Sequence, residues 1–567
     1  MKLLTVQDLS IQFKSASGLV QAVKSLSFDL NESEILGIVG ESGSGKSVTA
    51  MSITKLLSSN AVYASGSIKF IEKDLKAVEL LTLSENELRA YRGNKISIIF
   101  QEPMSALNPV LTCGYQLAES LLSHQICSKK EVHEVVKYWF SKVGLTETDR
   151  IYKSYPHQLS GGQLQRVLIA LALCCNPKLV IADEPTTALD VSIQKKILEL
   201  LLELKKELGL TIIFISHDLS VVKFLCDRVL VMKQGIKIEE NTVGEIFNYP
   251  VTDYTKGLIY CRPNLTIKLR RLPTIQDFEN NNGLNWYRDE NVINNTEQDR
   301  IADQLSDQSK IIRINDLNIK FVQKRNWLGK VTKELHAVKN VNLNINSGEV
   351  LGLVGESGSG KSSLGKAILG LTKVDSGSVF YGDINISQLN NRNWRPLRKE
   401  IQIIFQDPYS SLNPRKSIDS ALTEPMLVNR MYNSSLERKE RAIELLELVG
   451  LKADHMSRYP HQFSGGQRQR ICIARALALS PKFIVCDESV SALDVSIQAQ
   501  VLNLLLELKL KFKLSLLFIT HDLSVVNYIA DRVVVMNQGT IVEEGLPYQI
   551  ISNPKSEYTK SLINAIV

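Results

Sequence analysis

One eight-residue sequence occurs twice in this chain and strongly limits what the chain can fold into. Its two copies are Gly40-Glu41-Ser42-Gly43-Ser44-Gly45-Lys46-Ser47 and Gly355-Glu356-Ser357-Gly358-Ser359-Gly360-Lys361-Ser362. Both match the phosphate-binding loop G-x-x-x-x-G-K-[ST], in which backbone N–H groups and the lysine hold phosphates and the hydroxyl faces Mg²⁺. Each follows an apolar run, 35–39 or 350–354, that predicts a buried parallel strand. Two identical copies in the same context make a chance match to a Gly/Ser turn negligible.

The repeat extends far beyond these loops. Residues 2–13 match 310–321, and residues 160–254 match 464–558 without an insertion. The second copy carries extra residues around Trp327-Leu328-Gly329, and the first carries extra residues between the loop and Gln101. The chain is therefore a tandem duplication of a domain of roughly 260 residues rather than a short-period solenoid.

The stretch between the copies differs in composition. Residues 265–309 are rich in Asn and acidic side chains, which predicts a flexible acidic linker, with a small helix left open. We therefore expect a first domain over residues 1–264, a linker over 265–309 and a second domain over 310–567.

Short apolar strands alternate with amphipathic helices inside each copy. Residues 179–182, 211–215 and 228–232 have the composition of buried strands, and 193–207 has helical leucine spacing. This alternation predicts an α/β fold with a mainly parallel sheet.

Composition excludes several other classes of protein. No apolar run reaches the length of about 18 residues needed to span a membrane, and the first residues do not resemble a signal peptide. The 8 cysteines form no C-x-x-C pair, which favours a reducing compartment without disulfides or zinc. The net charge of +7 is mild and favours a solvated surface of mixed sign.

Two acidic pairs follow predicted strands: Asp183-Glu184 and Asp487-Glu488. A carboxylate at the end of a buried strand, in a domain with a phosphate-binding loop, is the expected partner of Mg²⁺. The second carboxylate can polarise a water for attack on the γ-phosphate. The alternative is an ordinary exposed loop, which we would favour if no phosphate-binding loop were present.

A Ser-Gly-Gly-Gln sequence precedes a predicted helix in each copy. The residues are Ser160-Gly161-Gly162-Gln163 and Ser464-Gly465-Gly466-Gln467. A serine and glycines at a helix N-terminus offer N–H donors to an anion. Alone, this sequence would indicate a common turn at the start of a helix. Its spacing from the other motifs favours an anion-binding role instead.

Together these motifs resemble the ATP-binding-cassette (ABC) ATPases over nearly the whole chain except the linker. In order, they are the loop, Gln101 or Gln406, the Ser-Gly-Gly-Gln signature, the acidic pair, Ala188-Leu189-Asp190 or Ala492-Leu493-Asp494, and His217 or His521. The resemblance implies two cassettes, each with a RecA-like sheet core, a β subdomain and a helical subdomain. It implies ATP and Mg²⁺ as ligands and ATP hydrolysis as the activity.

The resemblance also implies roles for individual residues. Glu184 and Glu488 would be catalytic bases, with Gln101, Gln406, His217 and His521 at the γ-phosphate. Ser47, Gln101 and Asp183, and Ser362, Gln406 and Asp487, would hold Mg²⁺. Phe13 and Phe321 would stack on adenine near Val23 and Val338, and the alternative is that they are core residues. Each signature would complete the site of the other cassette. Pairing of the two cassettes within one chain is expected, and pairing between two chains is the alternative. Phe463 and Ser489 depart from the family pattern, and we expect small effects from them.

Finer features resemble the peptide-importer branch. They are the sequences from Gln101 to Pro109 and Gln406 to Pro414, Tyr-Pro-His-Gln before each signature, and Tyr254-Thr255-Lys256 and Tyr558-Thr559-Lys560 near the end of each copy. The fused layout of this chain resembles two types of ATPase in this branch. One is the YejF type, which serves peptides and peptide antibiotics, and the other is the glutathione-importer type. The YejF type is favoured.

The branch implies a specific assembly. The partners would be two transmembrane permease subunits and an extracytoplasmic peptide-binding protein, with no nucleic acid. The chain would lie peripherally on the cytoplasmic face of the bacterial inner membrane and would dock through 102–157 and 407–461.

Three alternatives stay open. The first is a soluble tandem ABC ATPase that acts on ribosomes, for which a long charged helical linker is expected. The second is a DNA-repair or chromosome ATPase, for which an inserted coiled coil or zinc cysteines are expected. The third is a regulatory ATPase without transport.

Overall fold

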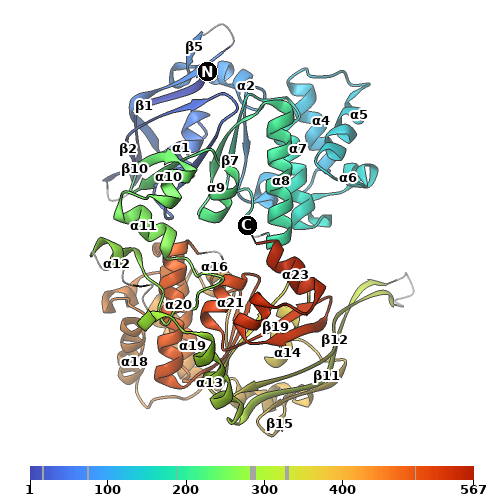
Figure 1. Ribbon diagram of the computed structural model, residues 1–567, viewed down its shortest axis with the longest axis vertical. Coiled ribbons are helices and arrows are strands. Elements are labelled where there is room, and N and C mark those ends of the chain that lie inside the picture. The colour runs from blue at the N-terminus through green and yellow to red at the C-terminus, as the bar shows by residue number, and fades with distance from the viewer. Residues whose placement is uncertain are drawn as a thin grey trace. The chain divides into compact units, whose positions relative to one another are not determined.

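The computed structural model describes residues 1–15, 18–72, 76–187, 189–280, 286, 289–325, 331–491 and 493–566 (Figure 1). The chain forms two compact units, Met1–Ile259 and Tyr260–Ile566. Each unit contains one copy of the repeat, and each is described by itself.

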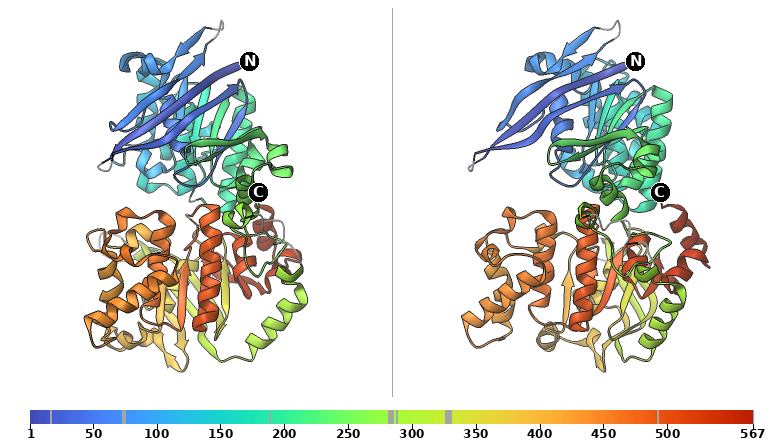
Figure 2. Two further views of the ribbon diagram at one scale, coloured as in Figure 1. Left: turned by 90° about the vertical axis from the view of Figure 1, so that its left-hand side faces the viewer. Right: turned by 60° about the vertical axis from the view of Figure 1, so that its left-hand side comes forward.

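The first unit contains an antiparallel sheet in the order β2-β1-β4-β5. Val6 on β1 lies opposite Phe28 on β2 and Ile68 on β4. These side chains are buried, so one face of this sheet packs onto the core. The strands are β1 (Lys2–Ser15), β2 (Gly18–Asn31), β4 (Ala61–Ile71) and β5 (Ala77–Glu79), and the long β1 and β2 are blue in Figure 2.

A six-stranded sheet with the order β10-β9-β3-β8-β7-β6 forms the centre of the first unit. Five of its strands run parallel, and β10 is antiparallel to β9. Every residue of β3, β7 and β8 is buried, as expected for strands covered on both faces. The strands are β3 (Ile35–Val39), β6 (Ile96–Ile99), β7 (Leu179–Asp183), β8 (Thr211–Ile215), β9 (Arg228–Lys233) and β10 (Ile236–Thr242).

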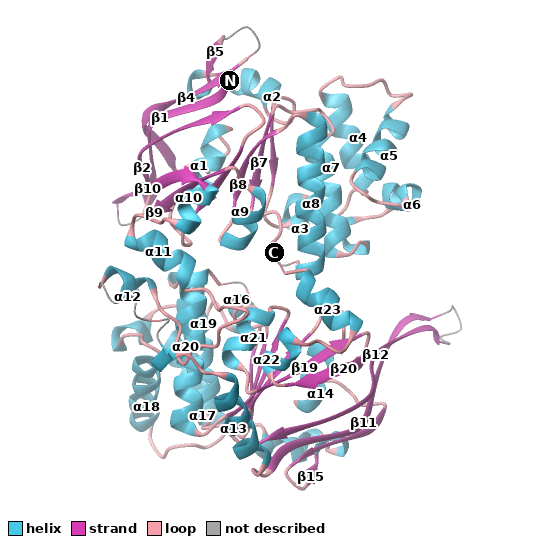
Figure 3. Ribbon diagram, in the orientation of Figure 1, coloured by secondary structure: helices cyan, strands magenta, loops and turns pink. Residues whose placement is uncertain are grey.

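The helices of the first unit fall into two groups. One group belongs to the sheet core, and the other forms a helical subdomain in which α4, α5 and α6 lie together (Figure 3). The core helices are α1 (Lys46–Ile53), α2 (Glu85–Tyr91), α7 (Gly161–Leu173), α8 (Val191–Leu208), α9 (Leu219–Leu225), α10 (Val243–Asn248) and α11 (Asp253–Tyr260). The others are α3 (Pro103–Ala106), α4 (Cys113–Ser123), α5 (Val132–Lys142) and α6 (Thr148–Lys153).

The second unit repeats both sheets. Its sheet orders are β12-β11-β14-β15 and β16-β17-β18-β13-β19-β20. The first sheet contains β11 (Lys310–Arg325), β12 (Val331–Asn346), β14 (Ser376–Tyr381) and β15 (Ile384–Asn385). The second contains β13 (Val350–Val354), β16 (Ile401–Ile404), β17 (Phe483–Asp487), β18 (Ser515–Thr520), β19 (Arg532–Asn537) and β20 (Thr540–Gly545).

The helices of the second unit follow the same order along the chain. They are α14 (Lys361–Ile368), α15 (Asn391–Leu397), α16 (Pro408–Ser411), α17 (Ile418–Val428), α18 (Ser435–Leu448), α19 (Gly465–Leu477), α20 (Val495–Phe512), α21 (Leu523–Ile529), α22 (Pro547–Ser552) and α23 (Glu557–Asn564).

The fold class predicted from the sequence is confirmed: both units have a mainly parallel sheet between helices. The predicted strand at 35–39 coincides with β3, and the predicted helix at 193–207 lies within α8. The extra residues around Trp327-Leu328-Gly329 lie outside the described part of the chain.

The stretch expected to be a flexible linker differs from that expectation. Residues from Tyr260 onward belong to the second unit, and they contain α12 (Ile275–Glu279) and α13 (Asn295–Ser306). The apolar residues Leu269, Leu272, Ile275 and Phe278 are buried. We call the described residues of 260–306 the strap. The burial of these apolar side chains offsets the entropy that a free coil would keep.

Two side chains of the second cassette bind the backbone of the strap. The Asn503 amide donates to the Leu272 carbonyl and accepts from the Leu272 N–H, both at 2.9 Å. The Asn527 amide donates to the carbonyls of Asn264 and Leu265 at 3.0 and 3.1 Å. The strap, green in Figure 1, is therefore an ordered part of the second unit.

Candidate nucleotide-binding sites

Four neighbouring parallel strands bring the sequence motifs of each cassette to one edge of its sheet. In the first unit these strands are β3, β8, β7 and β6, in that spatial order. The phosphate-binding loop follows β3, His217 follows β8, Asp183 ends β7 and Gln101 follows β6. Ligands of open α/β sheets bind beyond the carboxyl ends of the strands, so this edge is the candidate site.

The phosphate-binding loop requires glycine at its ends. Gly40 has φ 148° and Gly45 has φ 100°, in the region that favours glycine. A Cβ on Gly40 would lie 2.2 Å from the Met232 carbonyl oxygen, and one on Gly45 would lie 2.7 Å from that of Ala22. Gly355 and Gly360 repeat both features. Neighbouring backbone thus fixes the loop in the same shape twice.

The loop lysines fold back over their own loops. Lys46 Nζ donates to the carbonyls of Gly40 and Glu41 at 2.7 and 2.9 Å, and Lys361 Nζ to those of Gly355 and Glu356 at 2.7 and 2.8 Å. Ser44 Oγ is buried within the first loop and has no hydrogen-bond partner among the described residues. A cation and buried donors around a glycine loop fit a phosphate chain.

A tyrosine near the end of each repeat contacts the loop, which the motifs did not predict. The Tyr254 hydroxyl accepts the Glu41 N–H at 3.2 Å, and the Tyr558 hydroxyl accepts the Glu356 N–H at 2.9 Å. The gap-free match between the repeats extends to these tyrosines, and this was the signal in the sequence that could have indicated them.

A serine and an aspartate meet where Mg²⁺ is expected. Ser47 Oγ donates to Asp183 Oδ1 at 3.0 Å, and Ser362 Oγ donates to Asp487 Oδ1 at 2.8 Å. Burial raises the pKa of both aspartates; the serine hydrogen bond lowers it and the adjacent Glu184 or Glu488 raises it further. A divalent cation would stabilise the buried carboxylate, so these residues fit Mg²⁺.

The candidate base adopts a strained backbone conformation in both cassettes. Glu184 has φ 46° and Glu488 has φ 47°, which is uncommon for a residue other than glycine. The N–H of each glutamate donates to the neighbouring strand, to the Ile215 carbonyl at 3.0 Å and the Ile519 carbonyl at 2.9 Å. Such strain concentrates at functional sites, where surrounding contacts hold it.

Glu184 is held by three side chains. Its carboxylate accepts from Gln101 Nε2 at 2.9 Å and from Thr187 Oγ1 at 3.0 Å, and it lies 3.1 Å from His217 Nδ1. Burial alone would raise the pKa of Glu184, but His217 and Thr187 lower it below the usual value. The carboxylate is therefore ionised and can accept a proton.

Glu488 has a similar but looser arrangement. It accepts from Gln406 Nε2 at 2.9 Å, and His521 Nδ1 lies 3.7 Å away. The contact with His521 lowers the pKa of Glu488, and burial opposes this. Burial would lower the pKa of His521, but Glu488 and Asp522 raise it above the usual value.

Each signature sequence caps a helix on the surface. Ser160 Oγ accepts the Gln163 N–H at 3.3 Å, and Gln163 Oε1 accepts the Ser160 N–H at 3.1 Å; Ser464 and Gln467 repeat this capping box. A Cβ on Gly162 would lie 2.9 Å from Ile193, so this glycine permits close packing. Ser160 and Gly161 are exposed.

The proposed adenine-stacking residues differ between the cassettes. Phe13 is partly buried against the core, whereas Phe321 is 41% exposed. Val23 and Val338 are fully buried, as core residues are. Ala188 and Ala492 lie outside the described residues, while Asp190 Oδ1 accepts the Ile193 N–H at 3.0 Å and caps α8.

Comparison with known proteins identifies the family. The model described as "ABC transporter" matches residues 23–187 and 338–491, more than half of the chain. The chain belongs to the ABC transporter family. A second model, "Oligopeptide/dipeptide transporter, C-terminal region", matches residues 238–282.

Named relatives match over nearly the full length of this ABC protein. The glutathione import ATP-binding protein GsiA of Shigella boydii is 44% identical over 99% of this chain and 89% of its own length. GsiA of Escherichia coli O157:H7 is also 44% identical, over 99% of this chain and 89% of its own length. GsiA of Pectobacterium atrosepticum is 42% identical, over 100% of this chain and 89% of its own length. The structure of cbiO1 from Clostridium perfringens, part of the ABC transporter complex cbiONQ, covers 43% of this chain and 92% of its own, with 27% identity and a TM-score of 0.38.

These comparisons bear on the interpretations that the sequence left open. The chain is an ATP-hydrolysing subunit of an ABC importer, as predicted. Of the two fused types, these relatives are of the glutathione-import type rather than the YejF type that the sequence favoured. Within the described parts of the chain, no helix is both long and apolar enough to cross a membrane.

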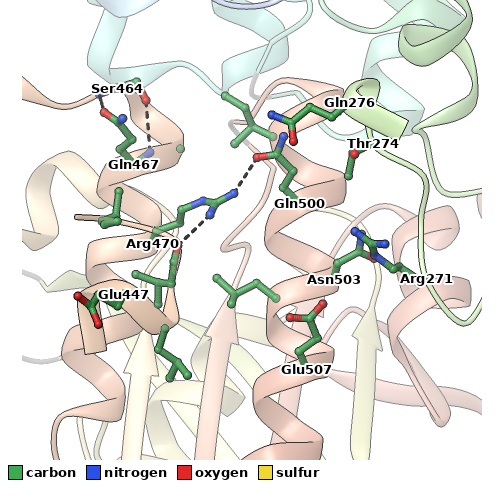
Figure 4. Close-up of a pocket in the computed structure, with 17 residues that line it drawn as sticks. Arg271, Thr274, Gln276, Glu447, Ser464, Gln467, Arg470, Gln500, Asn503 and Glu507 are labelled. Atoms are coloured by element: carbon green, nitrogen blue, oxygen red, sulfur yellow. Dashed lines mark hydrogen bonds between the residues drawn. The ribbon is translucent and has the colours of Figure 1, made fainter. Parts of the chain in front are cut away.

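A cavity of about 650 Å³ adjoins the signature of the second ABC cassette (Figure 4). The Arg470 guanidinium bridges its walls, donating to the Val449 carbonyl at 2.8 Å and to Gln500 Oε1 at 2.7 Å. Arg271, Thr274 and Gln276 of the strap line the same cavity as Ser464 and Gln467. The strap therefore reaches the signature helix, which the expected coil would not have done.

Proposed function

We propose that this ABC ATPase drives the import of peptides or peptide-like compounds, with glutathione as the first candidate. The observation that carries the substrate class is the match of residues 238–282 to the C-terminal region of oligopeptide/dipeptide transporters. The printed names of the relatives, glutathione import proteins, support glutathione within that class.

Each cassette would contribute to both ATP sites. Lys46, Ser47, Gln101, Asp183, Glu184 and His217 would act with Ser464, Gly466 and Gln467, and the equivalent set around Lys361 would act with Ser160, Gly162 and Gln163. The exposure of Ser160 and Gly161 at a helix N-terminus supports a phosphate contact outside their own cassette. Mg²⁺ at Ser47–Asp183 and Ser362–Asp487 would neutralise phosphate charge.

Within each site, the glutamate and the histidine would have different roles in hydrolysis. Glu184 and Glu488 would accept the proton of the attacking water, because both are ionised and hydrogen-bonded to Gln101 or Gln406. His217 and His521 would orient these carboxylates and contact the γ-phosphate. The hydrogen bond from each glutamate N–H to the neighbouring strand would hold this backbone conformation before substrate arrives.

The partners would be two transmembrane permease subunits and an extracytoplasmic peptide-binding protein. Large apolar side chains are exposed in both segments that follow the glutamines, which supports docking there. They include Met104, Val110 and Tyr115 in the first segment and Tyr409, Leu427 and Val428 in the second. The chain would thus lie on the cytoplasmic face of the bacterial inner membrane.

Reconstitution tests this proposal. The chain would be purified with its co-purifying permeases and placed in liposomes with the binding protein, and uptake of labelled glutathione and a labelled tripeptide would be followed. We expect ATP-dependent uptake, and ATP hydrolysis stimulated by the transported compound. Uptake of neither compound, or co-purification with ribosomes in place of permeases, would contradict the proposal.

The ribosome-associated alternative is disfavoured by the region between the cassettes. A tandem translation factor is expected to carry a long charged helix there. The described helices of that region, α12 and α13, have 5 and 12 residues, and the strap packs on the second cassette.

A further inference from the structure

A second cavity, of about 470 Å³, lies where the strap packs on the second cassette. Residues of the strap and residues of the cassette near α21 and α22 line it together. A smaller cavity of about 80 Å³ shares Lys268, Ile293 and Gln298 with it. The volume of the larger cavity falls within the range of small-ligand sites.

One wall of this cavity carries a buried cation. Lys268 Nζ donates to the Ala530 carbonyl, and an ammonium group has three N–H donors, so donors are left for another acceptor. Burial lowers the pKa of Lys268 to about 8, with Asp531 opposing the shift and Lys509 adding to it. The side chain is therefore still mainly charged at neutral pH.

The N-terminus of α13 forms a second part of the wall. Asn294 and Asn295, which begin this helix of 12 residues, line the cavity, and Asn294 Oδ1 accepts the Glu297 N–H at 2.9 Å. The first turn of a helix carries N–H donors and a partial positive charge. Lys268 and this turn together favour an anionic group.

Gln298 adds an acceptor within the same site. It is 7% exposed and lines both cavities, yet its Oε1 has no hydrogen-bond partner among the described residues. A buried acceptor without a partner costs free energy of about 1–3 kcal/mol, so it indicates a missing donor.

Apolar side chains form the remaining walls. They are Leu265, Ile267, Val292, Ile293 and Ile551. The cavity thus combines a cation, a helix N-terminus, an unpartnered acceptor and an apolar wall. These four features together fit a ligand that has both charged and apolar groups.

We propose that this cavity binds a small α-amino acid or short peptide with an apolar side chain. The carboxylate would accept from Lys268 and the first turn of α13, and the amino group would donate to Gln298 Oε1. The apolar side chain would lie against Leu265, Ile267 and Ile551.

The residues that line this site in the second cassette are not repeated in the first. In the aligned repeat, Asn527, Tyr528 and Tyr548 are replaced by Lys223, Phe224 and Gly244. Phe224 is 40% exposed, whereas Tyr528 is buried and lines the smaller cavity together with Lys268 and Leu269 of the strap. One ligand per chain is therefore expected.

Three matched probes test each part of the ligand in the full chain. L-leucine has all three groups, 4-methylpentanoate lacks the amino group, and L-leucinamide lacks the carboxylate; leucyl-leucine serves as the peptide. Calorimetry at neutral pH should show one site for leucine or leucyl-leucine. Each incomplete analogue should bind about tenfold more weakly or worse, because it loses a charge-assisted hydrogen bond.

Variants locate the binding. Gln298→Leu should weaken the binding of leucine about tenfold and leave the binding of 4-methylpentanoate unchanged. This variant keeps Lys268 and its hydrogen bond to Ala530. Lys268→Met should remove the preference for a carboxylate. The control Lys439→Met changes a lysine on α18 whose side chain is 55% exposed, and it should bind like the wild type. Retained ATP binding would verify that each variant is folded.

Several results would overturn the proposal. These are the absence of binding by leucine and leucyl-leucine, equal binding of leucine to Gln298→Leu, or acetate binding as tightly as leucine. Binding is measured without permeases, so failure here would leave the importer proposal standing, and failure of transport would leave this site standing.

Discussion

At the residue scale, the two candidate bases share a backbone conformation that is uncommon for a residue other than glycine. Glu184 and Glu488 combine a positive φ with a carboxylate held by a glutamine and a histidine. The Asp-Glu pattern predicted which residue would act. The backbone conformation could not be predicted, because it depends on the neighbouring strand that accepts the glutamate N–H.

Glu488→Gln should lower steady-state ATP hydrolysis by at least about 100-fold and leave ATP bound, because an amide cannot accept the proton of the attacking water. Phosphate release and nucleotide binding would be measured in parallel. The exposed Glu203→Gln, on α8, is the matched control and should hydrolyse ATP normally. Hydrolysis at the wild-type rate in Glu488→Gln would refute its role.

Tyr558→Phe should weaken ATP binding about fivefold, because the loop loses the hydroxyl that accepts the Glu356 N–H at 2.9 Å. Nucleotide titration of the chain would measure this effect. Tyr249→Phe, at a side chain that is 78% exposed, is the control. Equal affinities in all three proteins would show that the contact does not hold the loop.

Lys268 makes stability depend on pH in a predictable direction. Its pKa in the folded chain is about 8, below the ordinary 10.5, so between these values the unfolded chain binds more protons. The free energy of unfolding should therefore rise from about pH 8 to 10.5, by up to about 3 kcal/mol from this group. Lys268→Met should remove that rise.

Urea unfolding of wild type and Lys268→Met across this pH range would measure the difference. Asp531, Lys509 and Arg270 lie near the lysine and remain in both proteins, so the two proteins differ at this site only by the Lys268 side chain. Curves that stay parallel would contradict the assigned pKa.

At the element scale, the strap shows where sequence reasoning failed. Its Asn-rich, acidic composition predicted a coil, although Leu265, Ile267 and Leu269 alternate as in a strand and Leu272, Ile275 and Phe278 recur every three residues. What orders it lies elsewhere in the chain, in Asn503, Asn527 and Tyr528, which only the tertiary fold brings to it. The core strands, in contrast, carry their own signal as continuous apolar runs.

Asn503→Leu should loosen the strap without unfolding the cassette. It leaves the Leu272 N–H and carbonyl and the Tyr528 hydroxyl without their partner, at a cost of about 3 kcal/mol. Hydrogen exchange over 264–279 should become faster. Glu199→Leu, the aligned and exposed position of the first cassette, is the control, and similar exchange in both variants would contradict the role of Asn503.

At the scale of the whole molecule, the boundary of the second unit precedes the boundary expected from the repeat. The sequence predicted that the second domain begins at 310, whereas the second compact unit begins at Tyr260. The repeat alignment could find the duplicated part, but a segment present only once has no counterpart to align with.

A fragment of residues 260–567 should therefore melt at a higher temperature than one of residues 310–567. The shorter fragment loses the burial of Leu269, Leu272, Ile275 and Phe278, each contributing about 1.5–3 kcal/mol. Scanning calorimetry of both fragments would measure the difference. Equal melting temperatures would show that the strap contributes nothing to the second unit.

The strap also limits how a gene for this chain can vary. The two halves share their loops, yet only the second carries Asn503, Asn527 and Tyr528 where the first has Glu199, Lys223 and Phe224. Recombination that copied the first half over the second would keep both sets of nucleotide-binding residues. It would remove the side chains that bind the strap. The halves are thus no longer interchangeable parts, and their order in the reading frame is fixed by a segment that neither half repeats.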